Sequence, residues 1–123
     1  MIRAVGIDVI EIRRVQQSLQ RFGDRFRARV FTDRECRYCD SHSEAHIHFA
    51  ARFAAKEAVM KALGTGWGRG VEWKQIEVLS HEGQAPRLSL TGRAGELCQS
   101  ARIHLSLSHS RSIAAAVVVL EEV

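Results

Sequence analysis

The chain has 123 residues, of which 46% are hydrophobic and 26% charged, and its formal net charge is +4. These values predict one globular domain over residues 1–123, and three cysteines are an unlikely framework for a secreted disulfide scaffold. The longest apolar run, residues 113–120, falls short of the roughly 20 residues that cross a bilayer. Asp8 and Glu11 interrupt the first apolar stretch, where a signal peptide would need continuity. We therefore expect a soluble, cytoplasmic protein.

After one N-terminal strand, the first half of the chain is predicted to be helical. Apolar residues recur at helical spacing over residues 12–22, and Gly23 is placed to end that helix. Thr32 and Glu35 form the pattern of a capping box, so a further helix should begin at Asp33. The expected elements are a strand at 2–9, helices at 11–22, 24–31, from 33 and at 44–63, and a glycine-rich loop at 64–70.

The second half is predicted to be mainly strands. Apolar and polar residues alternate at 87–91 and at 103–107, and residues 113–120 have the continuous apolar character of a buried strand. The residues between the last two strands favour an antiparallel hairpin. With a further strand at 76–79 and a short helix at 92–100, the pattern indicates an α+β fold with helices packed on a mainly antiparallel sheet.

Two acids lie in segments that are otherwise apolar. Asp8 is in the run of residues 4–12, and Glu57 is on the long predicted helix, one turn before Lys61 and on the same face. Apolar neighbours should keep water from Glu57 and Lys61. Charges in such surroundings need partners, so the two acids suggest a shared cation such as Mg²⁺, which commonly takes one or two carboxylates. Two simpler roles stay open: Asp8 favouring the start of the next helix, and Glu57 pairing with Lys61.

Cys36 and Cys39 have the spacing of a CxxC motif, and three histidines follow them. Thiolates and imidazoles are zinc ligands. The capping-box pattern, however, places both cysteines on one helix, and no second CxxC occurs. The sequence therefore favours structural cysteines over a zinc or redox site.

Arginines are concentrated between residues 13 and 37, a span with eight arginines and only three acids. Such a basic surface favours an acidic partner. A small RNA-binding module is one interpretation, because arginines neutralise phosphates. Aromatic residues are not interleaved with these arginines for base stacking, and RNA binding would leave Asp8 and Glu57 without a role. We therefore expect no nucleic-acid partner and no membrane partner.

Two motifs together resemble the signatures of the 4'-phosphopantetheinyl transferases. They are Val5-Gly6-Ile7-Asp8 and the run FAAKEAVMK at residues 53–61. The following Gly64-Thr65-Gly66, the turn GQAP at 83–86 and the stretch HLSLSH at 104–109 extend the resemblance along nearly the whole chain. With the short length, they resemble one branch, the holo-acyl-carrier-protein synthases. The resemblance implies a mainly antiparallel sheet packed against a long central helix, and a homotrimer with active sites between subunits.

The resemblance also implies an activity in fatty acid biosynthesis. The 4'-phosphopantetheine arm of coenzyme A would move to a serine of apo acyl carrier protein, leaving adenosine 3',5'-bisphosphate. Asp8 and Glu57 would bind Mg²⁺, and Asp8, Glu57 and Lys61 would be catalytic, with Lys61 offsetting charge at the phosphate. The base that takes the serine proton is either Glu57 or a metal-bound water. An inactive scaffold with the same fold is a further alternative, which the intact Asp8, Glu57 and Lys61 argue against.

Further residues are expected to bind the two substrates. The expected coenzyme A contacts are Arg52, Lys56, Lys61, Gly64, Thr65, Gly66, Ser108 and His109. Arg14 stands at the family's position for docking the carrier, and the neighbouring candidates are Arg13, Arg21 and Arg25. Simpler roles stay open: a solvated helix edge for the basic residues, a helix C-cap for the glycines and a turn for His109.

Overall fold

The computed structural model describes residues 1–66 and 68–123, and it has the predicted α+β architecture. The expected element types and most boundaries are confirmed, and the short 3₁₀ helix η1 is an addition. In chain order the elements are β1 (Ile2–Glu11), α1 (Ile12–Phe22), α2 (Asp24–Val30), α3 (Asp33–Asp40), α4 (Ala45–Leu63), η1 (Trp73–Gln75), β2 (Ile76–Leu79), β3 (Arg87–Leu90), α5 (Gly92–Cys98), β4 (Arg102–His109) and β5 (Ile113–Glu121).

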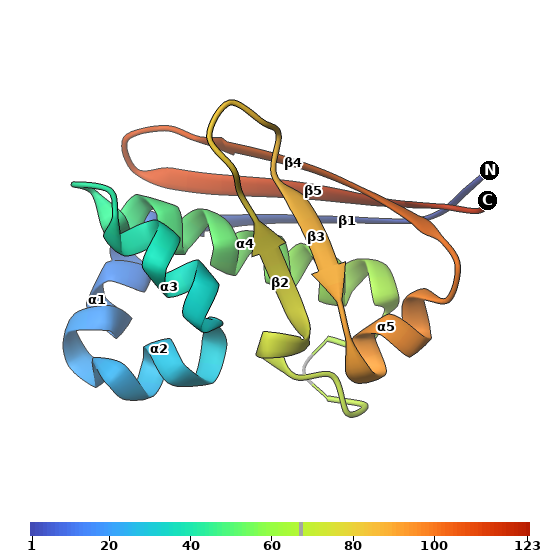
Figure 1. Cartoon of the computed structure of the whole chain (residues 1–123), viewed down its shortest axis with the longest axis horizontal. Helices are drawn as coiled ribbons and strands as arrows, with labels where there is room; N and C mark the ends of the chain where they lie inside the picture. Colours follow the sequence, from blue (N-terminus) through green and yellow to red (C-terminus); the bar gives the residue numbers. More distant parts are fainter. Residues whose placement is uncertain (67) are drawn as a thin grey trace.

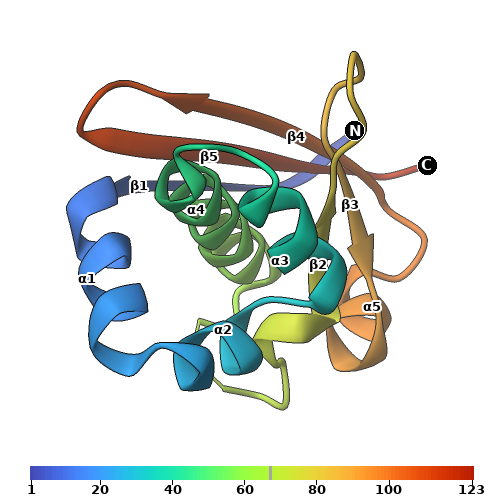
Figure 2. The same ribbon diagram turned by 60° about the vertical axis from the view of Figure 1, so that its left-hand side comes forward.

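A three-stranded antiparallel sheet in the order β1-β5-β4 forms one layer, and α4 runs along one of its faces (Figure 1). The predicted hairpin of the last two strands is therefore confirmed. Strands β2 and β3 form a separate antiparallel pair. Viewed nearly along α4, helices α1 and α2 lie on one side of it, while α3 and the β2–β3 pair lie on the other (Figure 2). The long helix thus separates two sides of the molecule.

Gly6 allows β1 and α4 to approach each other closely. A Cβ atom at this position would lie 1.9 Å from the backbone oxygen of Ala58, which is far inside van der Waals contact. Only glycine fits such a contact without moving the helix. The approach brings the segment around Asp8 on β1 against the segment around Glu57 on α4.

The predicted capping box at the start of α3 is formed, and it is part of a larger buried cluster. The Thr32 side chain accepts a hydrogen bond from the backbone of Glu35, whose own carboxylate accepts from the backbone of Thr32. The second oxygen of Glu35 accepts from the backbone of Val78 on β2. Cys36 and Cys39 lie on this helix as predicted, and burial raises the pKa of the Cys39 thiol to about 12.

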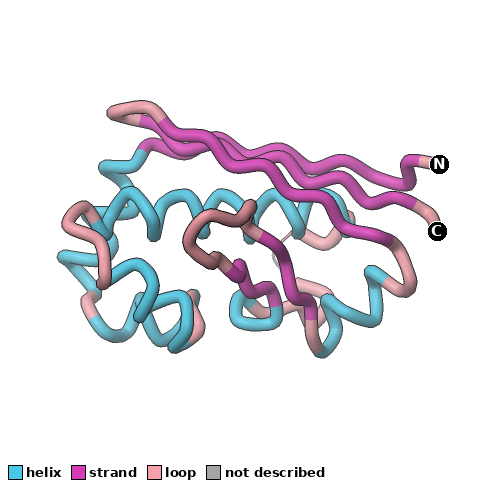
Figure 3. The backbone as a smooth tube through the Cα atoms, turned by 45° about the horizontal axis from the view of Figure 1, so that its top comes forward, coloured by secondary structure: helices cyan, strands magenta, loops and turns pink. Residues whose placement is uncertain are grey.

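The other face of the three-stranded sheet has no helix over it (Figure 3). We call it the outer sheet face. Val5, Ile7 and Val9 on β1 point to this side and form an apolar row, with exposed fractions of 57%, 59% and 59%. In the register of the sheet they lie beside Val119, Val117 and Ala115 of β5. Exposed apolar surface of this extent is typical of an interaction surface.

The two ends of the chain lie side by side (Figure 1), where the backbone of Glu122 donates to the carbonyl oxygen of Met1 at 2.8 Å. Among the helices that the structure describes, none combines the length and apolar character needed to cross a membrane.

Candidate active site

The two predicted acids line one cavity between α1, β1 and α4. This carboxylate cavity has a volume of ≈ 560 Å³. Asp8 reaches it from β1 and Glu57 from α4, while Arg14 and Arg21 line it from α1. The aromatic ring of Phe53, one turn before Glu57, forms part of its wall. Segments about fifty residues apart in the sequence thus place two carboxylates and two guanidinium groups around one space.

Lys61 forms an ion pair with Asp8. Its ammonium lies 3.1 Å from Asp8 Oδ1 and donates to the carbonyl oxygen of Ile7 at 2.9 Å. The Asp8 side chain is largely buried, whereas the Lys61 side chain is 53% exposed. The expectation that little water reaches Lys61 is therefore wrong, because this side chain extends from α4 past the edge strand β1. The alternative ion pair with Glu57 is not among those formed by the described residues.

Burial and nearby charges act in opposite directions on the pKa of Glu57. Burial raises its pKa and the negative charge of Asp8 raises it further, while Lys61 and Arg14 act to lower it. The net shift is upward. The two carboxylates therefore repel each other across the cavity, and a cation between them would relieve that repulsion.

The donor set fits Mg²⁺ in its common mode of binding. No group of three or more His, Cys, Asp or Glu side chains able to hold a metal occurs within the described part of the chain. Mg²⁺ seldom needs such a group, because it usually keeps waters and binds one or two carboxylates together with substrate phosphates. Asp8 and Glu57 supply the two carboxylates, and their position on the walls of one cavity is the observation that favours a bound cation.

Lys56 lies in the interior of this structure, and its predicted contact with coenzyme A stays a prediction. Its side chain is 0% exposed, and its ammonium lies 2.8 Å from the carboxylate of Glu35. It also donates to the carbonyl oxygens of Trp73 and Ile76. Lys56 therefore ties α4 to α3, η1 and β2, because it points to the side of the helix that is packed against these elements.

Arg52 and His109 line a second cavity, whose other lining residues come from α3, α4, the β2–β3 connection and β4 and not from α1 or β1. We call it the arginine cavity, and its volume is ≈ 210 Å³. His48, Ser80 and Gln84 also line it. It shares no lining residue with the carboxylate cavity. The structure thus separates Arg52 and His109 from the carboxylates of Asp8 and Glu57 within one chain.

The remaining predicted coenzyme A residues line neither of these two cavities. Ser108 precedes His109 on β4 and pairs with Ala115, so it shares the outer sheet face. Gly64, Thr65 and Gly66 follow the C-terminal end of α4, just beyond Lys61, and Gly64 has the left-handed conformation of a helix C-cap. The C-cap role predicted for this glycine is confirmed.

The predicted docking arginines lie on different faces. Arg14 and Arg21 line the carboxylate cavity, and Arg25 lines an adjoining groove of ≈ 510 Å³, the aromatic groove. Arg13 instead lines a cavity with His46 and Arg111. The structure therefore separates Arg13 from the other three.

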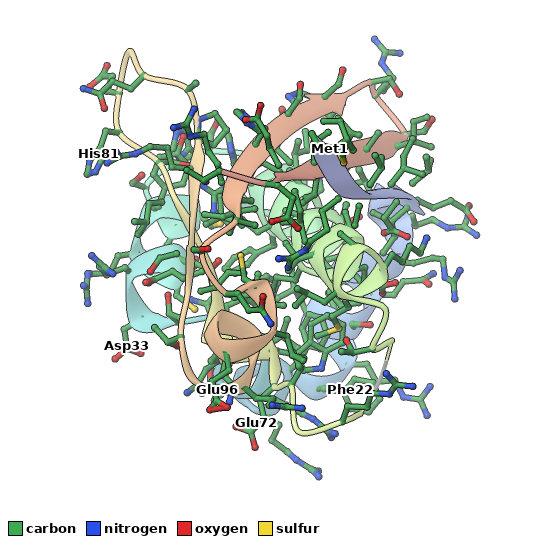
Figure 4. All side chains as sticks on the ribbon, turned by 90° about the vertical axis from the view of Figure 1, so that its right-hand side faces the viewer. Met1, Phe22, Asp33, Glu72, His81 and Glu96 are labelled. Carbon is green, nitrogen blue, oxygen red and sulfur yellow. The ribbon has the colours of Figure 1, made fainter. Side chains whose placement is uncertain are left out.

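The aromatic groove contains residues that the sequence analysis missed. Its walls include Phe22, Phe26 and Phe53, and Arg29 joins Arg25 on its rim. Phe22 is 49% exposed and lies at the molecular surface (Figure 4). The spacing of four between Arg25 and Arg29 would have signalled one face of α2.

Comparison with known proteins identifies the family. The model of the 4'-phosphopantetheinyl transferase superfamily matches residues 4–118. A holo-[acyl-carrier-protein] synthase from Koribacter versatilis is 49% identical over 125 residues, covering 99% of this chain and 100% of the relative. The chain belongs to the 4'-phosphopantetheinyl transferase superfamily. A second member, a holo-[acyl-carrier-protein] synthase from Methylorubrum extorquens, is 45% identical and covers 100% of this chain and 96% of the relative.

Solved structures of the family agree. A holo-(acyl-carrier-protein) synthase from Bacillus anthracis, in complex with coenzyme A (3',5'-ADP), superposes with a TM-score of 0.84 at 38% identity, covering 100% of this chain and 99% of that one. The family member from Neisseria meningitidis has a TM-score of 0.87 at 30% identity, with 99% and 100% coverage. The expected fold of the family is therefore confirmed.

Proposed function

We propose that this protein is a holo-[acyl-carrier-protein] synthase. It transfers the 4'-phosphopantetheine arm of coenzyme A to a serine of apo acyl carrier protein, which supports fatty acid biosynthesis, and it releases adenosine 3',5'-bisphosphate. One observation carries the proposal: Asp8 and Glu57, one from each family motif, line a single cavity. Close relatives along the whole chain with this activity in their names support it.

The reaction is a phosphoryl transfer that depends mainly on position and charge. The serine oxygen forms a bond to the β-phosphorus of coenzyme A, and the bond from that phosphorus to the oxygen of the leaving nucleotide breaks. Glu57, whose pKa is raised by burial and by Asp8, accepts the serine proton, either directly or through a water. Lys61 lies beside Asp8 and is exposed enough to turn its ammonium toward the phosphates.

Asp8 and Glu57 would together hold Mg²⁺. When bound, Mg²⁺ polarises the phosphate and stabilises charge on the leaving oxygen. The two carboxylates supply the protein's share of the donor set, and the substrate phosphates and waters supply the rest. Removing either carboxylate would also remove the repulsion that favours a cation here.

A second subunit would complete the site. The carboxylate cavity and the arginine cavity share no lining residue, so we propose that one coenzyme A uses the first from one subunit and the second from its neighbour. The outer sheet face offers an apolar surface for that assembly, which we take to be the homotrimer implied by the sequence. A cytoplasmic location stays a prediction from the sequence.

The carrier would dock along α1 and α2. The aromatic groove adjoins the carboxylate cavity, because Phe22, Phe26 and Phe53 line both. Arg14, Arg21 and Arg25 give this surface the positive charge that suits an acidic carrier protein. Complementary charge of this kind mainly raises the association rate and orients the partner.

Release of the leaving nucleotide tests this function. We expect adenosine 3',5'-bisphosphate to accumulate, by liquid chromatography, when the protein is incubated with coenzyme A, Mg²⁺ and an apo acyl carrier protein. A carrier whose acceptor serine is replaced by alanine should give none. Release that does not depend on that serine would identify a hydrolase, and no release with a folded protein would reject the proposal.

A further inference from the structure

Arg52 is a buried cation without a carboxylate partner in the described part of the chain. Its side chain is 2% exposed and its guanidinium lies 4.2 Å from the centre of the Tyr38 ring. It donates to the carbonyl oxygen of His48 at 3.2 Å and to the hydroxyl of Ser80 at 2.6 Å, while its buried Nε has no hydrogen-bond partner. Among the described residues, no carboxylate forms an ion pair with it. A buried guanidinium stays charged and is costly when unpaired, so this position favours an anion.

The arginine cavity sets the size of that anion. Its volume of ≈ 210 Å³ is below the roughly 300 Å³ at which pockets for whole ligands begin. Its polar lining consists of Tyr38, His48, Ser80, Gln84 and His109 beside Arg52. These groups donate hydrogen bonds, and none of them is acidic. A single phosphate group, with several acceptor oxygens, suits both the space and the donors.

His48 is poised to gain a proton when such an anion arrives. Its ring centroid lies 4.0 Å from that of His42, with the two ring planes tilted by 35°, and it meets the Tyr38 ring edge-on at 5.7 Å. Burial lowers its pKa, and positive charge on His42, Arg52 and His109 lowers it further, while Glu44 acts in the opposite direction. His42 and Glu44 face His48 from the α3–α4 connection, Arg52 from α4 and His109 from β4. In the free protein these surroundings therefore disfavour the charged form of His48.

We propose that His48 is a further coenzyme A-binding residue, which takes up a proton on binding and holds the 3'-phosphate of the nucleotide as an imidazolium. The proposal rests on the proposed function and adds a residue that the family motifs do not contain. The phosphate dianion supplies the negative charge that the cavity lacks, so it offsets the repulsion from Arg52. The close contact of the His42 and His48 rings limits the pair to one added proton, because two charged rings at 4.0 Å would repel each other.

Binding of coenzyme A should become tighter as the pH falls. The pKa of His48 is lowered in the free protein and is raised when a phosphate dianion lies beside it. Between these two values the bound state holds more protons than the free state, so affinity rises as the pH falls. The phosphate itself gains a proton near pH ~6, which sets the lower limit of the effect.

Calorimetric titrations with coenzyme A and with dephospho-coenzyme A, which lacks the 3'-phosphate, test the proposal. Titrations in two non-phosphate buffers of different ionisation enthalpy, at several pH values between about 6 and 8, report the protons taken up. For the wild-type protein we expect proton uptake with coenzyme A only, and a preference for coenzyme A over dephospho-coenzyme A that increases as the pH falls.

Three variants assign the effect to His48. His48→Gln should no longer take up a proton on binding. At the lowest pH of the series its preference for coenzyme A over dephospho-coenzyme A should fall about tenfold, because one charge-assisted hydrogen bond is lost. His48→Arg should restore the preference and make it independent of pH, because the guanidinium is always charged. His46→Gln is the matched control, since His46 is on the same helix but lines a different cavity, and it should behave as the wild type.

Two results would overturn the proposal while leaving the proposed function intact. One is equal binding of the two ligands by the wild-type protein, and the other is unchanged proton uptake in His48→Gln. Failure of the wild-type protein to bind either ligand would instead reject the proposed function, and this inference with it.

Discussion

At the scale of single residues, burial distinguishes two lysines of the same motif. Lys56 is wholly buried and paired with Glu35, whereas Lys61 is half-exposed and paired with Asp8. They are five residues apart, so they point to different sides of α4. The sequence predicts that both lie on this helix. It does not predict their different roles, because these depend on which neighbouring element each side of the helix meets.

Replacing Lys56 should affect stability more than chemistry. We expect Lys56→Met to lower the free energy of unfolding by about 3–5 kcal/mol, because Glu35 would remain as an unpaired buried carboxylate. The double variant Lys56→Met/Glu35→Gln should lose less than the sum of the two single variants. Urea unfolding at a fixed protein concentration measures both. As a control, Lys61→Met should change stability little, and an equal loss in this exposed variant would contradict the assignment.

At the scale of elements, local signals predicted most of the fold. Gly23 ends α1, and the Thr32–Glu35 capping box begins α3, because these residues act on the adjacent backbone alone. The two family motifs likewise predicted Asp8 and Glu57 as site residues. The division of the substrate residues between two cavities was not predictable, since it arises from the packing of β1, α1 and the β2–β3 pair around α4.

Glu77 on β2 holds the beginning of α3 and makes stability sensitive to acid. Its carboxylate accepts from Thr32 Oγ1 and from the Arg34 guanidinium, both at 2.6 Å. Burial alone would raise its pKa, but the hydrogen bonds from Arg34 and Thr32 outweigh burial and lower it from 4.5. The folded state thus binds the proton less readily than the unfolded state. The contribution is complete above pH 4.5 and is lost as the pH falls through the lowered value.

Thermal melting of the wild type and of Glu77→Gln from neutral pH to about pH 3 checks this assignment. We expect the variant to be less stable at neutral pH, and the difference between the two melting temperatures to shrink as the pH falls below 4.5. A constant difference across the range would show that the carboxylate charge of Glu77 does not contribute.

The two faces of α1 provide a matched pair of docking variants. Arg14 lines the carboxylate cavity, whereas its neighbour Arg13 lines a different one. We expect Arg14→Glu to raise the KM for the carrier about tenfold or more, with a smaller change for coenzyme A, because the reversed charge repels an acidic partner. Arg13→Glu should change either KM much less. Equal effects of the two variants in steady-state kinetics would remove Arg14 from the docking surface.

At the scale of the whole molecule, the proposed active site needs residues from more than one copy of the chain. The carboxylate cavity and the arginine cavity share no lining residue, and the outer sheet face presents Val5, Ile7 and Val9 to its surroundings. A shared site would bring the two cavities together across an interface. Assembly and activity would then be inseparable, since each subunit supplies half of two sites.

Complementation between two inactive variants tests this sharing. Glu57→Ala removes the carboxylate half of a site, and Arg52→Gln removes the cation of the other half while keeping a hydrogen-bonding group near Ser80. When the two variants are co-expressed, random assembly should restore about a quarter of the wild-type sites. Activity no higher than that of the separate variants, from mixed assemblies confirmed by native mass spectrometry, would place the whole site within one subunit.

The most direct test of the central claim is the intact mass of an apo acyl carrier protein after incubation with this protein, coenzyme A and Mg²⁺. We expect the mass of the carrier to increase by one phosphopantetheine, and we expect no increase with EDTA or with the folded variants Asp8→Ala and Glu57→Ala. Glu11→Gln, a change of an exposed acid on the same strand as Asp8, should keep the gain. No gain with the wild-type protein, or a normal gain with either alanine variant, would contradict the account.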